Sequence, residues 1–161
     1  MKVVLTGATG FIGSHILAEL KEHGHGVVAL GRDDVDLYDR PAVVRLLSDA
    51  DAAIHTASPG DETSADLDAA VADAAIEAFT GTGKPYLHIS GIWIYGNNTS
   101  IDEGSPIDAP GMVAWKEPIE ARILAATGMR GVVVVSIVGV ERLKKNKGTG
   151  GWAGGSKCAR S

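Results

Sequence analysis

The stretch TGATGFIG, residues 6–13, most strongly limits what this chain can fold into. It follows directly on the β-branched run KVVLT of residues 2–6 and opens a segment with helical spacing of apolar residues. Gly7 permits a tight turn off a strand, Gly10 lets the backbone approach a ligand closely, and Gly13 lets the helix pack against the sheet. The free N–H groups at the start of such a helix attract phosphates. The pattern therefore predicts a dinucleotide-binding turn, and its alternative is a glycine-rich turn that binds nothing.

Apolar runs and helical patterns alternate along the rest of the chain. Strands are predicted at residues 2–6, 26–30, 52–55, 86–90 and 131–138. Helices are predicted from residue 11 to the stop signal at 23–24, after the N-cap Asp39, over 64–79 and over 115–126. Continuous apolar strands separated by helices indicate a parallel sheet covered on both faces. The predicted fold class is therefore α/β, a Rossmann-like doubly wound parallel sheet of about five to six strands in a single domain.

The predicted helix over residues 64–79 has one apolar side. Leu67, Val71, Ala75 and Ile76 recur on one face, and the acidic residues, Asp68 among them, are expected elsewhere on the helix. The helix is thus predicted to cover the sheet with its apolar face.

Composition narrows the class of protein. The chain has 161 residues and a formal net charge of −5, which argues against a nucleic-acid partner. No stretch approaches the roughly 18–20 apolar residues of a membrane span, and the glycine-broken N-terminus lacks the features of a signal peptide. The single cysteine, Cys158, excludes an internal disulfide and most zinc patterns, so no metal site is predicted. We expect a cytoplasmic protein with no membrane partner.

The last 21 residues differ from the rest. Residues 1–140 carry 9 Lys/Arg and 19 Asp/Glu, or −10, whereas residues 141–161 carry 6 and 1, or +5. The segment is rich in glycine and has almost nothing to bury. We therefore predict a Rossmann-like domain over residues 1–140 and a disordered basic tail over residues 141–161, with a basic docking tail as the alternative.

The runs TGATGFIGSHILAEL and HGHGVVALGR together closely resemble the extended and atypical short-chain dehydrogenase/reductases. This superfamily includes sugar-nucleotide epimerases and dTDP-4-dehydrorhamnose reductases, and the resemblance extends from Met1 to about Val138. It implies binding of a nicotinamide dinucleotide and hydride transfer. The cofactor-binding positions that it implies are Gly7, Thr9, Gly10, Phe11, Ile12, Gly13, Arg32, Asp36, Leu37, Thr56, Ala57, Ser58 and Lys116.

Arg32 bears on the choice of cofactor. Relatives that prefer NAD usually end the second strand with an acidic residue, whereas here the strand ends Leu30-Gly31-Arg32, and the guanidinium of Arg32 suits a 2′-phosphate. NADP is therefore favoured over NAD, although Asp33 and Asp34 follow and could serve the ribose instead. By the resemblance, Asp36 and Leu37 form the adenine pocket. The segment from Thr56 to Ser58 lines the cofactor ribose, and His55 before it is more simply a strand-end histidine.

The catalytic pattern of the superfamily is altered. Residues 112–120, MVAWKEPIE, reproduce the spacing of a Tyr-x-x-x-Lys helix that continues to Glu120, but Met112 stands where the tyrosine belongs. A thioether cannot exchange a proton. Lys116 is retained, either as a ligand of the cofactor ribose or as a plain surface lysine.

The preceding strand is altered as well. Gly91 aligns with the usual catalytic Ser/Thr, and Ser90 lies one position away, on the opposite face of a regular strand. Tyr95 carries a hydroxyl that could substitute for the missing one. Lys116, Ser90 and Tyr95 are therefore the candidate catalytic residues.

These observations favour an NAD(P)-dependent oxidoreductase or epimerase-like protein. Its chemistry would be hydride transfer at a carbonyl or secondary alcohol of a small or sugar-like substrate of unknown identity. The alternative is a non-catalytic NADP-binding redox sensor or an inactive remnant, because the family's C-terminal substrate lobe is expected to be missing through truncation. Apolar surface exposed by that loss leaves homo-oligomer formation open.

Overall fold

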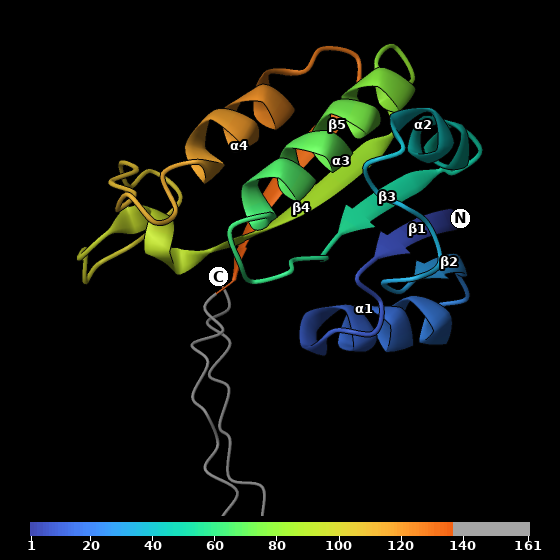
Figure 1. The fold of residues 1–161 in the computed structure, drawn as a ribbon, viewed down its shortest axis with the longest axis horizontal. Coiled ribbons are helices and arrows are strands. Elements are labelled where there is room, and N and C mark those ends of the chain that lie inside the picture. The colour runs from blue at the N-terminus through green and yellow to red at the C-terminus, as the bar shows by residue number, and fades with distance from the viewer. Residues whose placement is uncertain (137–161) are drawn as a thin grey trace, which may run out of the picture.

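The computed structural model describes residues 1–136 and shows a five-stranded parallel sheet (Figure 1). The order of the strands in the sheet is β2-β1-β3-β4-β5. Their bounds are β1 Lys2–Thr6, β2 Gly26–Leu30, β3 Ala52–His55, β4 Pro85–Gly91 and β5 Arg130–Ser136. Every paired strand runs parallel to its neighbour, so the predicted Rossmann-like fold is confirmed. The last two residues of the strand predicted at 131–138 and the predicted tail lie outside the described residues.

Helices connect the strands, as the alternation predicts. They are α1 Phe11–Glu22, α2 Arg40–Ser48, α3 Ser64–Phe79 and α4 Lys116–Ala125, with a short 3₁₀ helix, η1, at Ile92–Tyr95. The carboxylate of Asp39 accepts a hydrogen bond from the backbone N–H of Ala42 and caps α2. Pro118 lies in the first turn of α4, where proline is tolerated. Within residues 1–136, none of the helices combines the length and the apolar character required to cross a membrane.

The larger part of the core lies between the sheet and the helices α2, α3 and α4 (Figure 1). Val43 and Leu47 of α2, Val71 of α3 and Ile123 of α4 pack there against residues of the central strands. Phe79 at the end of α3 is completely buried. This face of the sheet therefore has continuous helical cover.

The opposite face is covered less completely. Helix α1 packs there against β1, β2 and β3 through Ile16, Leu17 and Leu20. On β4 the side chains alternate between buried and half-buried, and Ile89 belongs to the half-buried set. Val134, its partner on β5, is 38% exposed. Among the residues that the structure describes, the α1 side of β4 and β5 is thus the open part of the sheet.

Candidate functional site

The glycine turn between β1 and α1 is closely packed. Gly7 has a φ of 72°, and a Cβ at this position would lie 2.6 Å from the backbone nitrogen of Ala57. A Cβ on Gly13 would overlap the carbonyl oxygen of Gly7. The hydroxyl of Thr56 donates to the carbonyl of Thr6 at 2.8 Å, so the turn after β3 holds the turn after β1. The predicted roles of Gly7 and Gly13 in backbone geometry are both present in the structure.

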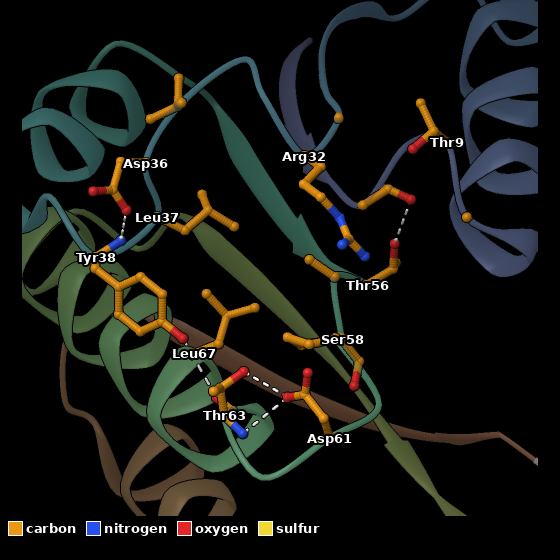
Figure 2. A pocket seen from close by; sticks show the side chains of 16 residues that line it. Thr9, Arg32, Asp36, Leu37, Tyr38, Thr56, Ser58, Asp61, Thr63 and Leu67 are labelled. Atoms are coloured by element: carbon orange, nitrogen blue, oxygen red, sulfur yellow. Dashed lines mark hydrogen bonds between the residues drawn. The ribbon is translucent and has the colours of Figure 1, made fainter.

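A pocket of about 440 Å³ opens beside this turn (Figure 2). It lies at the carboxyl ends of β1, β2 and β3, because its walls come from the segments that follow these three strands, including the start of α3. Its lining residues are Gly7, Thr9, Gly10, Gly31, Arg32, Val35, Asp36, Leu37, Tyr38, Thr56, Ala57, Ser58, Pro59, Asp61, Thr63 and Leu67. The volume is within the range of about 300–1,000 Å³ that is typical of small-molecule sites. The carboxyl edge of an open α/β sheet is also where such folds bind ligands.

Most of the predicted cofactor residues line this pocket. Gly7, Thr9 and Gly10, then Arg32, Asp36 and Leu37, and then Thr56, Ala57 and Ser58 come together from three loops. The structure thus brings together nine residues that are spread over 52 positions of the sequence, from 7 to 58.

The remaining predicted cofactor residues lie outside the lining. Phe11 is 68% exposed, Ile12 is half-buried, and Gly13 is buried where α1 meets the turn. Lys116 is also absent from the lining. These residues belong to the start of α1 and α4, and their contact with a cofactor stays a prediction.

Two acidic residues after β2 are engaged in shaping their own loop. Asp34 accepts a hydrogen bond from the backbone N–H of Gly31 at 2.6 Å, and Asp36 accepts one from Tyr38 at 2.9 Å. Figure 2 shows the side chain of Arg32 directed into the pocket. The loop therefore presents a guanidinium to the pocket and uses the Asp34 carboxylate internally.

The sequence reasoning missed the lower wall of the pocket, formed by Tyr38, Asp61, Thr63 and Leu67. The hydroxyl of Tyr38 donates to the carbonyl of Thr63 at 3.4 Å and joins the loop after β2 to the loop before α3. Hydrogen bonds from Thr63 lower the pKa of Asp61, and the charge of Arg32 acts in the same direction. The signal that could have found this wall is topological, since every loop after a strand of a parallel sheet reaches the same edge.

The candidate catalytic residues lie near the end of β4. Ser90 is buried, and its hydroxyl donates to Oε1 of Glu120 at 2.5 Å. Tyr95 is half-buried at the end of η1, and Met112 is 68% exposed. A Cβ added at Gly91 would have no atom within 4 Å, so a side chain would have open space there. The predicted alternation is present, because Ser90 is buried on the α4 side while Gly91 is half-buried.

A set of buried polar side chains surrounds the carboxylate of Asp68. We call it the Asp68 cluster, and its members are Thr6, His55, Asp68, Tyr86, His88 and Lys116. His55 Nε2 lies 3.1 Å from Oδ1 of Asp68, and Lys116 Nζ lies 3.1 Å from Oδ2. His88 Nε2 lies 3.4 Å from the same Oδ2, which is long for a hydrogen bond. Within residues 1–136, Nε2 of His88 is the buried side-chain nitrogen or oxygen atom that lacks a hydrogen-bond partner.

Asp68 corrects the prediction for α3. Its place outside the apolar stripe predicted a position away from the core, but the residue is 3% exposed. The reason is that β3, β4 and α4 each supply a polar partner, which offsets the cost of burying the carboxylate.

His55 is a neutral donor to Asp68, and hydroxyl groups lie against the Nδ1 atoms of both histidines. The hydroxyl of Thr6 lies 2.7 Å from Nδ1 of His55, and the hydroxyl of Tyr86 lies 3.3 Å from Nδ1 of His88. A hydroxyl that donates to Nδ1 leaves the ring proton on Nε2, facing Asp68. Burial lowers the pKa of His55 in spite of the neighbouring carboxylate. Burial also raises the pKa of the Tyr86 hydroxyl, so that group stays protonated.

Asp68 itself is ionised. Burial would raise its pKa, but the hydrogen bond from His55, the neighbouring His88 and the charge of Lys116 outweigh this and hold the pKa well below its usual range. The ammonium of Lys116 also lies 4.3 Å from the ring centroid of Trp115. The cluster therefore contains an ion pair, Asp68 with Lys116, packed against the neutral His55 and Tyr86.

Comparison with known proteins shows which family has this sequence and fold. The model of the NAD dependent epimerase/dehydratase family matches residues 3–111. The protein YLL056C of Saccharomyces cerevisiae is 32% identical over 129 residues, which are 67% of this chain and 43% of that protein. The chain spans about half the length of the curated relatives that it matches.

Solved structures agree on the fold. A dTDP-4-dehydrorhamnose reductase from Clostridium acetobutylicum superposes with a TM-score of 0.72 at 19% identity, over 84% of this chain and 52% of that one. The same enzyme from Bacillus anthracis, in complex with NADP, gives a TM-score of 0.68 at 19% identity, over 83% and 52% of the two chains.

Proposed function

Because the chain belongs to the NAD dependent epimerase/dehydratase family, we propose that it binds NADP, or less favourably NAD, along the carboxyl ends of its strands. The observation that carries this proposal is the pocket in which the glycine turn and Arg32 face the same space. The turn leaves room for backbone to approach a pyrophosphate, and a guanidinium binds a 2′-phosphate through charge-assisted hydrogen bonds.

The residues present fit such a dinucleotide. Gly7 and Gly10 would hold the pyrophosphate, Asp36 and Leu37 the adenine, and Arg32 the 2′-phosphate. Side chains at Gly7 would overlap the backbone of Ala57, so the cradle depends on glycine. When bound, the nicotinamide ring would supply or accept a hydride at a carbonyl or secondary alcohol. We propose a small or sugar-like molecule as the substrate, in keeping with the solved relatives that act on sugar nucleotides.

Proton transfer lacks its usual tyrosine in this chain, because Met112 stands at that position, and this motivates a second candidate function. Met112 has no proton to give, and the hydroxyl of Ser90 already donates to Glu120. Tyr95 is the remaining candidate acid near the end of β4. These observations favour, as the second candidate, a protein that binds NADP and senses its redox state without turnover.

Binding is tested by thermal unfolding of the full chain with NADPH, with NADH and without nucleotide. A ligand that binds the folded state increases the free energy of unfolding by about 2.7 kcal/mol at a hundred times its Kd, and so raises the midpoint temperature. We expect the larger rise with NADPH, its loss in Gly10→Val, and loss of the NADPH preference in Arg32→Ala. Arg45→Ala, an exposed arginine of α2 outside the pocket, is the matched control. No rise with either nucleotide, from a chain that unfolds cooperatively, would refute the proposal.

Turnover separates the two candidates. Oxidation of NADPH is measured with aldehydes, ketones and keto sugars, and transfer of deuterium from the labelled nicotinamide C4 identifies the product. The oxidoreductase proposal expects turnover that Lys116→Ala and Tyr95→Phe abolish. Turnover that persists in both variants would contradict the assignment of these residues, and binding without any turnover would favour the sensor.

A further inference from the structure

We propose that Asp68 is a positioning residue that, together with His55 and His88, fixes the ammonium of Lys116 for contact with the second half of the dinucleotide. This inference rests on the proposed function, because it concerns how the same site would hold its ligand. The histidines are part of the device, since they orient the carboxylate that orients the lysine.

The Asp68 cluster lies immediately behind the wall of the pocket. Thr56 and Leu67 line the pocket, and their chain neighbours His55 and Asp68 are buried on the other side of that wall. The side chains of His55, His88 and Asp68 are 2%, 1% and 4% exposed, whereas that of Lys116 is 17% exposed. Lys116 is thus the member through which the cluster reaches the surface.

Hydrogen-bond accounting shows why the carboxylate cannot turn. Oδ1 of Asp68 is occupied by His55, and Oδ2 faces both His88 and Lys116. The rings of the two histidines stack with their centroids 5.4 Å apart, which holds the two rings in place relative to each other. A carboxylate held in this way gives the ammonium of Lys116 one preferred position, and the Trp115 ring covers another side of it.

Position in the sheet indicates which half of a dinucleotide Lys116 would meet. The pocket is built on the loops after β2, β1 and β3, with the proposed adenine and 2′-phosphate contacts on the β2 side. A molecule that extends from the β2 side across the glycine turn after β1 would pass the end of β3 and then reach β4, which follows β3 in the order. Lys116 pairs with Asp68 beside His88 of β4. An ammonium that is fixed before the ligand arrives loses less conformational freedom on binding.

The test compares a dinucleotide with a fragment that lacks the second half. Affinities of NADPH and of adenosine 2′,5′-bisphosphate are measured by calorimetry for the full chain and for Asp68→Asn. If wild type prefers NADH, then NADH and ADP form the pair. We expect Asp68→Asn to weaken dinucleotide binding about tenfold, the scale of one hydrogen bond to a charged group, and to leave the fragment unchanged.

Asp73→Asn is the matched control. Asp73 and Arg122 form a second, more exposed ion pair between α3 and α4, so this variant reports any loosening of the two helices. It should change neither affinity. In Lys116→Met, a further Asp68→Asn change should have no additional effect on the dinucleotide, because the two residues act through one contact.

A measurement on the wild-type chain tests the inference even if Asp68→Asn fails to fold. In ¹H–¹⁵N spectra of ¹⁵N-histidine protein, the buried ring N–H groups of His55 and His88 should shift on addition of NADPH and stay in place with the bisphosphate. Equal shifts with both ligands, no shift with either, or equal losses of both affinities in the variant would each overturn the inference. A wild-type chain that binds the fragment but gains nothing from the second half would overturn it too, and would leave the nucleotide site standing. A chain that binds neither refutes the proposed function itself.

Discussion

Single residues in the glycine turn differ in what they contribute. A Cβ on Gly13 would overlap the carbonyl oxygen of Gly7, and it would also approach Oγ1 of Thr56 to 2.8 Å. A Cβ on Gly10 would meet the same carbonyl at the milder distance of 3.2 Å. Gly13 is therefore required by packing of α1 on the sheet, and Gly10 mainly by the space beside the turn.

This difference gives a prediction for stability. Gly13→Ala should lower the free energy of unfolding by about 2–4 kcal/mol, since the obstructing atoms belong to backbone that cannot move aside. Gly111→Ala is the control, because a Cβ there would have open space, and it should change stability by less than about 0.5 kcal/mol. Urea denaturation measures both. Equal effects of the two substitutions would contradict the packing described for α1.

The buried Asp68 cluster makes stability depend on pH. The pKa of His55 is lowered from its ordinary value of 6.5 in the folded chain, so below that pH the unfolded chain binds a proton that the folded chain does not. The free energy of unfolding should therefore fall as the pH drops below 6.5, by up to about 1.4 kcal/mol per pH unit for this one proton. The pKa of Asp68 is also lowered, so its contribution is lost later, as the pH falls below its ordinary value of 3.8.

Denaturation of wild type and His55→Gln at several pH values checks this sign. Wild type should lose stability between pH 7.5 and 5.5 more steeply than the variant, because glutamine does not titrate. The quantity compared is the slope with pH, so any constant loss of stability in His55→Gln cancels. A slope that is the same in both chains would contradict the neutral, buried state of His55.

At the level of residues, sequence reasoning found the glycine turn and most of the pocket, and it missed the Asp68 cluster. Gly7, Gly10 and Arg32 stand in short local patterns whose physical roles can be stated without a structure. Asp68, His55 and His88 lie on three different elements, and nothing local indicates that a helix will turn an acidic residue toward two strands. Only the packing of α3 against the sheet brings them together.

The start of α2 illustrates how a short local signal fixes an element. Asp39 stands before Arg40 and Pro41, and its carboxylate accepts from the backbone N–H of Ala42 at 3.1 Å. Asp39→Ala should therefore cost about 1 kcal/mol of stability, the usual value of an N-cap. Asp39→Asn retains an acceptor and should cost much less. Thermal unfolding of the three chains distinguishes a cap from a merely exposed carboxylate, for which both substitutions would be neutral.

Several predicted boundaries of the elements are confirmed, because glycine, proline or polar residues interrupt the apolar patterns there. The strands at 26–30 and 52–55 and the helix at 64–79 have the predicted bounds. The short 3₁₀ helix η1 was not predicted, because a single turn carries too few residues for a periodic signal. Pro118 restricted where α4 could begin, since proline is tolerated only in the first turn of a helix, and the helix begins at Lys116.

For the whole molecule, the alternation of strands and helices predicted the parallel sheet but not the unequal cover of its two faces. Within residues 1–136, three helices pack on one face and α1 packs on the other (Figure 1). Which face a connecting helix takes depends on the order of strands in space. That order is set by contacts between residues far apart in the sequence.

Two successive valines of β5 should report this inequality. Val133 packs toward the core under α2, α3 and α4, whereas Val134 points to the open side and is 38% exposed. Val133→Ala should destabilise the chain by about 1 kcal/mol more than Val134→Ala, because its methyl groups are more fully removed from water. The loss of strand propensity is common to both and cancels in the comparison. Equal costs, measured by urea denaturation, would show that the open face is covered in solution.

A Cβ added at Gly13 would overlap the carbonyl of Gly7, and this restriction bears on how the sequence of such a chain would change in evolution. Helix α1 cannot pack in this position without the two glycines. A lineage that had lost nucleotide binding would therefore still be selected to keep both of them. Gly10 has no comparable obligation to folding and would be free to drift. Among descendants of such a chain, conservation of the whole glycine-rich motif would not distinguish those that still bind a ligand. Variation at position 10 would, because only ligand binding would keep glycine there.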